Sequence, residues 1–164
     1  MSDRLDVRII TPDRVVYKSS SDSLIIPGTM GEMEILPGHV ALFSTIKPGE
    51  IRIKEGDQDL VYACGAGLLE VCADRVTLLV DSAAGSREID PREAAKLVAE
   101  AEDKLKNLSS EDEEERFAFE TQLAAAKARI EVYERTSGEH VPQHGFSRIS
   151  MEPINKEGED TSAE

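Results

Sequence analysis

The sequence contains no tryptophan and only two cysteines, Cys64 and Cys72. Two cysteines are too few for a disulfide framework or a four-ligand zinc site, so a reducing compartment is expected. No apolar run approaches the roughly 18–20 residues that a membrane-spanning helix needs. The first residues lack the apolar core and cleavage site of a signal peptide. We therefore expect neither insertion into a membrane nor export.

Basic residues are scarce relative to acidic ones. Lys and Arg number 19 against 33 Asp and Glu, which gives a formal net charge of −14 at pH 7. Nucleic-acid binding needs a surface rich in Lys and Arg to face the phosphates, so this charge excludes nucleic acid as a partner. A chain of 164 residues has room for one domain and a small appendage.

Residues 1–88 hold most of the glycines and read as a series of short strands. Leu5, Val7 and Ile9 alternate with polar residues, which is the period of a half-buried strand. Apolar pieces then recur about every 8–12 residues, which is typical of a β-sandwich or flattened barrel. The turn signals between them are Pro27-Gly28, Pro37-Gly38, Pro48-Gly49 and Gly56-Asp57.

Residues 89–136 change to a helical period. One predicted helical face consists of Ala94, Leu97, Val98, Ala101 and Leu105, and a second of Phe119, Leu123, Ala126, Ile130 and Tyr133. Asp90 is the predicted N-cap of the first helix, with Pro91 at its first position. Ser110 is the predicted cap of the second helix, whose first turn is Glu111–Glu115.

The short connection between the two predicted helices indicates an antiparallel hairpin. Several residues of its apolar faces are alanines, so we expect it to grip its neighbour weakly. Residues 137–164 are polar and lack periodicity, and are predicted to be a disordered tail. The chain therefore divides into three parts: residues 1–88, 89–136 and 137–164.

The three histidines do not form a local catalytic set. His140 and His144 have a spacing that binds metal on a helix, but Pro142 lies between them, so we interpret them as solvated. His39 follows a Pro-Gly turn, where packing or partner contact is favoured over catalysis. A triad assembled from residues distant in sequence stays open.

Three other features have ordinary structural interpretations. Cys64 and Cys72 lie on predicted strands and are expected to be small core residues. Gly65-Ala66-Gly67 lacks the helix and lysine of a phosphate loop. The Glu111–Glu115 run is interpreted as a solvated helix start. We therefore expect no catalytic residue, no cofactor and no metal.

The order of several segments resembles one family, the epsilon subunit of bacterial and chloroplast F-type ATP synthases (delta in mitochondria). The opening LDVRIITPDRVVY at 5–17 looks like the first hairpin of that family. The remaining segments are PGTMGEMEILPGHVAL at 27–42, IKPG at 46–49, CGAGLLEV at 64–71 and RVTLLVD at 75–81. The ILPGH element followed by KPG at this interval is the most specific part of the resemblance.

The resemblance implies a mainly β fold with an added α part: an N-terminal ten-stranded β-sandwich followed by an antiparallel helical hairpin. It implies a non-catalytic rotor subunit that links gamma to the c ring and couples proton flow to ATP synthesis. In bacterial members the hairpin also extends transiently into the catalytic alpha/beta head and inhibits ATP hydrolysis. The implied location is peripheral, on the cytoplasmic face of the bacterial plasma (inner) membrane.

The resemblance also implies two partner-contact elements. Gly31 and Glu32 are expected to face the polar loops of the c ring, and His39 to lie near gamma. The second element as a whole consists of Leu36, Pro37, Gly38 and His39. A proline-glycine turn stiffens such a loop and presents its side chains to a partner.

Some family members bind ATP through a motif of the form (I/L)DxxRA together with two arginines four apart on the second helix. Here Glu93 stands at the arginine of the motif, and Ala125 at one of the two helix positions. A carboxylate in place of a phosphate-binding cation reverses the local electrostatics, so ATP binding is not expected. The residues that do match are Ile89, Asp90, Ala94 and Arg129.

Two other functions stay open at this point. The chain could be a β-sandwich interaction module of a different complex, or a nucleotide-sensing regulator. Co-purification with a rotor subunit would distinguish the first, and direct measurement of ATP binding the second.

Overall fold

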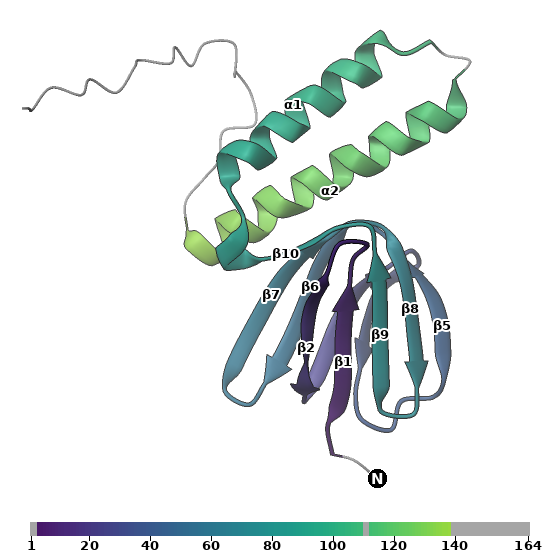
Figure 1. The fold of residues 1–164 in the computed structure, drawn as a ribbon, viewed down its shortest axis with the longest axis vertical. Helices are drawn as coiled ribbons and strands as arrows, with labels where there is room; N and C mark the ends of the chain where they lie inside the picture. The colour runs from purple at the N-terminus through teal and green to yellow at the C-terminus, as the bar shows by residue number, and fades with distance from the viewer. Residues whose placement is uncertain (1–2, 110–111, 139–164) are drawn as a thin grey trace, which may run out of the picture.

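A computed structural model describes residues 3–109 and 112–138 of the chain. Ten strands are followed by a short 3-10 helix and two α-helices (Figure 1). The strands are β1 (Leu5–Ile10), β2 (Val15–Ser21), β3 (Ser23–Gly28), β4 (Gly31–Ile35), β5 (Leu42–Ile46), β6 (Gly49–Glu55), β7 (Gln58–Cys64), β8 (Gly67–Cys72), β9 (Arg75–Val80) and β10 (Ala83–Gly85). The helices are η1 (Ser86–Glu88), α1 (Pro91–Asn107) and α2 (Glu113–Ser137).

The strands form one hydrogen-bonded sheet that curls into a sandwich. Its order is β10-β7-β6-β3-β5-β8-β9-β1-β2, and β4 pairs with β3 off this path. β1 and β9 pair in parallel, and the other pairs are antiparallel. The fold class predicted from the sequence, a ten-stranded sandwich followed by a helical hairpin, is confirmed.

Period-two alternation builds the core of the sandwich, because successive side chains of a strand point to opposite faces. Leu5, Val7 and Ile9 of β1 are fully buried, as their alternation predicts. They pack in one cluster with inward residues of the other strands, among them Leu24, Ile53, Leu69 and Leu78. Fully burying one such side chain contributes about 1.5–3 kcal/mol.

The first helix begins where the sequence predicts. The Asp90 carboxylate accepts hydrogen bonds from the Arg92 and Glu93 N–H groups (2.8 and 3.4 Å), and Pro91 is the first helical residue. The second helix begins later than predicted, at Glu113 rather than Glu111. Asp112 precedes it in place of Ser110, which, like Glu111, lies outside the described residues.

The second helix ends at Ser137, and Gly138 follows it in the left-handed conformation (φ 72°), which glycine adopts readily. The predicted tail, residues 137–164, therefore starts within the last turn of α2. Residues 139–164 lie outside the described residues, together with His140 and His144.

The two helices pack on each other through small side chains. Four residues of the predicted second face, namely Leu123, Ala126, Ile130 and Tyr133, cluster with Ala94, Ala95 and Val98 of α1. The prediction for Leu97 is wrong: it is 37% exposed, while Ala95 is buried in its place. The buried stripe of α1 is thus made chiefly of alanines and one valine, and it removes little apolar surface from water.

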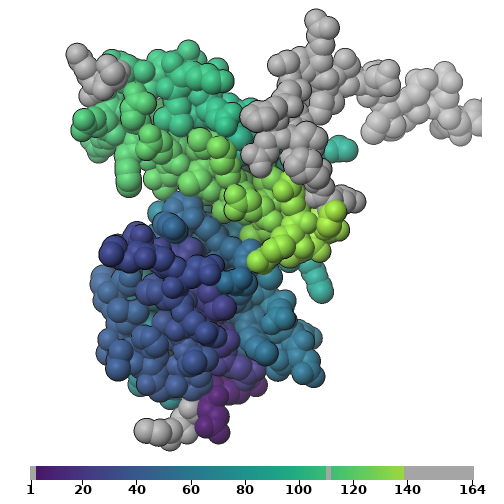
Figure 2. Space-filling model, turned by 180° about the vertical axis from the view of Figure 1, so that it is seen from behind, coloured from purple at the N-terminus to yellow at the C-terminus, as the bar shows by residue number. Residues whose placement is uncertain are grey.

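α2 also buries a second face, which its sequence did not reveal. Val132 is fully buried and packs with Ala63 of β7 and with Ile89, just before α1. α2 therefore lies between α1 and the sandwich, in contact with β6, β7 and η1. Figure 2 shows the C-terminal part of this helix resting directly on the sandwich. The hairpin is folded down across one end of the strands (Figure 1).

Candidate functional site

The two predicted partner-contact elements lie at opposite ends of β4. Gly31 and Glu32 begin this strand, and Leu36 to His39 follow its last residue, Ile35. A strand rises about 3.3 Å per residue, so roughly 15 Å separates the two elements along the sandwich. The structure thus does not bring them together, and they lie at opposite ends of the sandwich.

The first element lies at the tight turn between β3 and β4. Met30 is fully exposed at its tip, and Gly31 follows with φ 133°. The Glu32 carboxylate forms an exposed ion pair with Arg52 of β6. Both of its oxygens lie 3.1 Å from Arg52 Nη2, and its side chain is 65% exposed. A partner can therefore reach this carboxylate, but it must compete with Arg52.

The second element is a braced loop at the other end of the sandwich. The His39 N–H donates to the Leu36 carbonyl (3.1 Å), and the Gly38 N–H donates to Asp74 Oδ1 in the β8–β9 turn (3.0 Å). Gly38 has φ 78°, a conformation that side-chain-bearing residues rarely adopt. His39 Nδ1 lies 2.8 Å from the Val40 carbonyl, a contact that requires the proton on Nδ1. His39 is thus held in place rather than aligned with a nucleophile.

An exposed apolar surface lies on the outer face of β5, β8 and β9, and sequence reasoning missed it. Phe43 is 70% exposed, Leu79 50% and Leu68 38%. Leu68 pairs directly with Leu79, and Thr45, two residues from Phe43, pairs with Leu68, so the three side chains share one face. We call Phe43, Leu68 and Leu79 the outer patch.

The outer patch had a sequence signal. Leu68-Leu69 and Leu78-Leu79 are paired leucines inside strands, so one member of each pair must point outward. Exposed apolar side chains gathered on one sheet face, here beside the polar Thr45 and Glu70, are a feature of surfaces that bind other proteins. The patch therefore has the chemistry of a protein-docking site.

The residues of the partial ATP motif do not converge on one site. Asp90 caps α1, Ile89 packs beneath α2, and Ala94 is buried between the two helices. Arg129 lines a cavity of about 300 Å³ between the hairpin and the end of the sandwich. Each of the first three residues thus has a structural role in the folded-down hairpin.

The charges around this cavity balance. Arg129 and Lys104 line it together with Asp81 and Glu100, and Ala125 stands beside them. A triphosphate carries several negative charges and needs an excess of cations. The cavity lacks that excess among the described residues, which agrees with the substitution of Glu93 in the motif.

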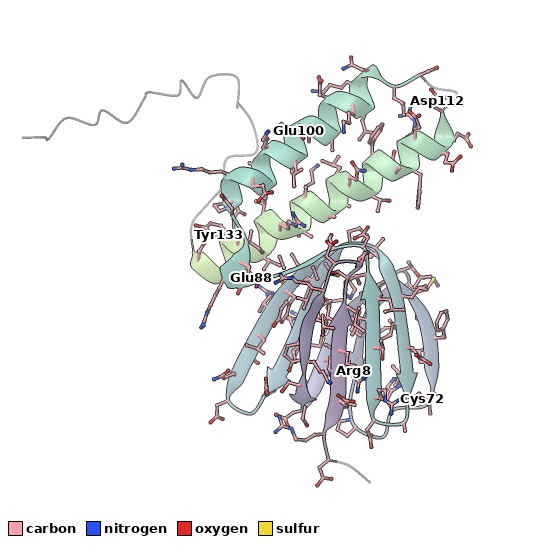
Figure 3. All side chains as sticks on the ribbon, in the orientation of Figure 1. Arg8, Cys72, Glu88, Glu100, Asp112 and Tyr133 are labelled. Atoms are coloured by element: carbon pink, nitrogen blue, oxygen red, sulfur yellow. The ribbon has the colours of Figure 1, made fainter. Side chains whose placement is uncertain are left out.

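The two cysteines have opposite environments. Cys64 is 2% exposed, and burial raises the pKa of its thiol from 9.0 to about 12. Cys72 was predicted to be a core residue and this is wrong, because it is exposed at the end of β8. Figure 3 shows Cys72 at the end of the sandwich away from the helices. Its position in the strand was right, but its side chain falls on the outward face.

Two tyrosines, Tyr17 and Tyr62, are packed against the core of the sandwich. The rings of Tyr17 and Tyr62 meet edge to face with centroids 5.8 Å apart. Burial raises the pKa of both phenols, and the Tyr17 hydroxyl bonds with Ser21 (2.8 Å) and donates to Glu55 (3.2 Å). This network joins β2 to β6.

Within residues 3–109 and 112–138 there is no group of three or more His, Cys, Asp or Glu side chains placed to hold a metal ion. The helices of this part of the chain are likewise too short or too polar to cross a membrane.

Comparisons with known proteins agree on one family. The family model "ATP synthase, Delta/Epsilon chain, beta-sandwich domain" matches residues 4–86. ATP synthase epsilon chains of Synechococcus elongatus and Geobacter metallireducens are 34% and 36% identical to this chain, over 77% and 79% of its length and 93% and 91% of theirs. That of Acidithiobacillus ferridurans is 33% identical over 90% of this chain and 100% of its own.

Two solved assemblies contain chains of similar fold. One chain belongs to the mitochondrial ATP synthase OSCP/F1/c-ring structure of Euglena gracilis, with a TM-score of 0.64 at 24% identity, covering 78% of this chain and 80% of that one. The other belongs to the central stalk and c ring of the Tetrahymena thermophila mitochondrial enzyme, with a TM-score of 0.51 at 11% identity, covering 79% and 96%.

Proposed function

The chain belongs to the delta/epsilon family of ATP synthase subunits, and we propose that it is the epsilon subunit of the central stalk of a bacterial F-type ATP synthase. In this role it is non-catalytic. It joins gamma to the c ring, so that rotation driven by proton flow is coupled to ATP synthesis in the alpha/beta head. It is held peripherally at the cytoplasmic face of the plasma membrane through these partners.

The outer patch is the observation that carries this proposal. Its three exposed apolar side chains lie on a rigid sheet face, which suits a permanent contact with gamma. The braced loop from Leu36 to His39 leads directly into β5, which bears Phe43. We therefore place the loop at the margin of the same contact, where it adds polar groups that set orientation.

Glu32 and the turn before it are the proposed contact with the c ring. The carboxylate is exposed, and the turn projects Met30 into solvent. A carboxylate at such a tip gives register against a polar or basic loop more than it gives affinity. Because this turn lies about 15 Å from the His39 loop, two different partners can be engaged at once.

The hairpin is the proposed regulatory part. It is held on the sandwich by one small apolar cluster, with Val132 packed against Ala63 and Ile89, so its release exposes little apolar surface. When extended, it would reach the alpha/beta head and suppress ATP hydrolysis. The balanced charge around Arg129 and the carboxylate at Glu93 argue that ATP does not stabilise the folded-down state in this chain.

The test measures ATP hydrolysis by a catalytic head that retains gamma but lacks this chain. The full chain and residues 1–88 are added back in turn. Both should bind, and only the full chain should suppress turnover. Binding of both without any inhibition would restrict the function to coupling, and failure of the full chain to bind would overturn the proposal.

A further inference from the structure

Four charged side chains of alternating sign run from the end of the hairpin to the β3–β4 turn. Arg135 of α2 forms an ion pair with Glu50 Oε1 of β6. The same oxygen lies 3.5 Å from Arg52 Nε. Arg52 Nη2 in turn lies 3.1 Å from both oxygens of Glu32. The charges therefore alternate in the order Arg135, Glu50, Arg52, Glu32.

The Glu50 carboxylate lies within ion-pair distance of two arginines, Arg52 and Arg135. Its side chain is only 20% exposed, and a single oxygen faces both guanidinium groups. Arg52 Nε is enclosed and lacks a hydrogen-bond partner among the described residues, since Glu50 Oε1, at 3.5 Å, lies beyond the usual N–H···O distance. Arg52 thus pairs with Glu32, and Glu50 pairs with Arg135.

The Arg135–Glu50 pair joins the hairpin to the sandwich. By contrast, the pairs Lys96–Glu100 and Lys127–Glu102 lie within the hairpin. The apolar contact that the joining pair supplements is thin, since it centres on Val132 against Ala63 and Ile89. The side chains of this ion pair are 44% (Arg135) and 20% (Glu50) exposed, so the pair adds a modest increment to this apolar contact.

We propose that Glu50 and Arg135 form a latch that holds the hairpin down, and that Arg52 transmits to this latch whether Glu32 is occupied. A cationic partner group that takes Glu32 frees Arg52. Arg52 then pairs more closely with Glu50 and displaces Arg135, so the hairpin loosens. The proposal rests on the proposed function only in naming the hairpin as the part that moves.

Three other charged residues lie near the latch and contribute to the electrostatic potential around it. Glu34, Lys54 and Asp59 line the groove of about 480 Å³ that also holds Arg52 and Arg135. They contribute one positive and two negative charges, and all three stay unchanged in the variants below. Differences among those variants therefore report on the four-residue series itself.

The series makes predictions of opposite sign. E50Q and R135Q remove the latch and should loosen the hairpin. E32Q should also loosen it, although the ion pair of Glu32 is with Arg52 of the sandwich, because Arg52 then turns to Glu50. R52Q should hold the hairpin more tightly, because Glu50 then pairs with Arg135 without competition from Arg52. A purely structural role for these side chains would give loosening or no change in all four.

The measurement is thiol trapping in the full chain carrying V132C. Val132 is fully buried under α2, so the introduced thiol reacts only when the hairpin lifts. Cys72 is exposed and serves as a fast internal reference, while buried Cys64 reports opening of the sandwich itself. Mass spectrometry resolves the three thiols in one sample. Because no partner is present, the result does not depend on whether the chain inhibits ATP hydrolysis.

We expect labelling at position 132 to rise about two- to five-fold in E50Q, R135Q and E32Q, the range for a partly exposed ion pair, and to fall in R52Q. The matched control K96Q, which breaks an ion pair on the solvent side of α1, should leave the rate unchanged. Added salt should raise the wild-type rate but not that of E50Q. An unchanged rate in E50Q overturns the latch, and an unchanged rate in E32Q overturns the transmission through Arg52.

Discussion

Individual residues owe their behaviour to which face of an element they occupy. Cys64 and Cys72 end two strands that are consecutive in sequence, β7 and β8, and both follow apolar strand residues. One is enclosed by the sandwich and the other faces water. Alternation places residues on one face or the other, but the register of the whole strand decides which face is inward. Leu69 and Val71 of β8 face the core, so Cys72 must face out.

Thiol reagents should therefore separate the two cysteines. We expect Cys72 to react in the native protein at the rate of a free thiol. Cys64 should react only when the sandwich opens, because burial keeps its thiol protonated and inaccessible. Mass spectrometry after brief labelling checks this, and equal modification of both cysteines would contradict the described core.

The raised pKa of Cys64 also predicts a loss of stability in alkaline solution. The unfolded chain releases this proton from about pH 9, whereas the folded chain holds it to about pH 12. The contribution of this group is thus fully present well below pH 9 and is lost as the pH rises, by about 1.4 kcal/mol between about pH 8 and about pH 10. Tyr17 and Tyr62 act in the same direction at higher pH.

Urea unfolding of the wild type and of C64A at about pH 8 and about pH 10 isolates the contribution of Cys64. The variant should be less stable at the lower pH, because it leaves a cavity. Its further loss on raising the pH should be smaller than that of the wild type by about 1.4 kcal/mol. Equal losses in the two proteins would mean that this thiol is not buried.

Single helices and strands are the level at which the sequence was most informative, with instructive exceptions. Asp90 and Pro91 correctly predicted the start of α1, because an N-cap hydrogen bond and the fixed φ of a proline ring depend only on neighbouring residues. The two buried faces of α2 were hidden, since Val132 packs on the sandwich while Ile130 packs on α1. A helix with two partners shows no clear apolar stripe.

Two short elements had no readable sequence signal. β10 has only three residues, and η1 consists of the polar segment Ser86–Glu88. Both form because the chain must pass beside β7 to reach α1. The outer patch was missed for a related reason, since reading each strand by itself does not reveal which apolar residues line up across strands. Pairing of Leu68 with Leu79 supplies that information.

The cap at Asp90 predicts a measurable loss of stability. D90A removes the acceptor of the Arg92 and Glu93 N–H groups and should destabilise the folded hairpin by about 0.5–2 kcal/mol. D103A, at an exposed position within the same helix, removes the same charge without a cap and is the control. Chemical unfolding followed by circular dichroism gives both values. A D90A value no larger than that of D103A would show that the cap does not stabilise α1.

The whole molecule combines a well-packed sandwich with a helical hairpin that is held on it by few contacts. The sandwich has a continuous core of large aliphatic residues, whereas alanines dominate the buried surface of α1. The sandwich carries the outer patch and the two proposed contact elements, and the hairpin lies over the opposite end of the strands from Cys72 (Figure 3). This division suits a subunit that stays bound to a rotor while its hairpin changes position.

Binding to gamma tests the assignment of the outer patch most directly. F43E places a charge at the most exposed residue of the patch, whereas F117E makes the same substitution at an equally exposed residue of α2, since the two side chains are 70% and 73% exposed. Neither side chain is in the core, so both variants should fold. We predict that a gamma-containing head retains the wild type and F117E and binds F43E at least about 30-fold more weakly, the loss of roughly 2 kcal/mol typical of a hot spot. Equal retention of F43E and F117E would contradict the assignment of this face as the rotor contact.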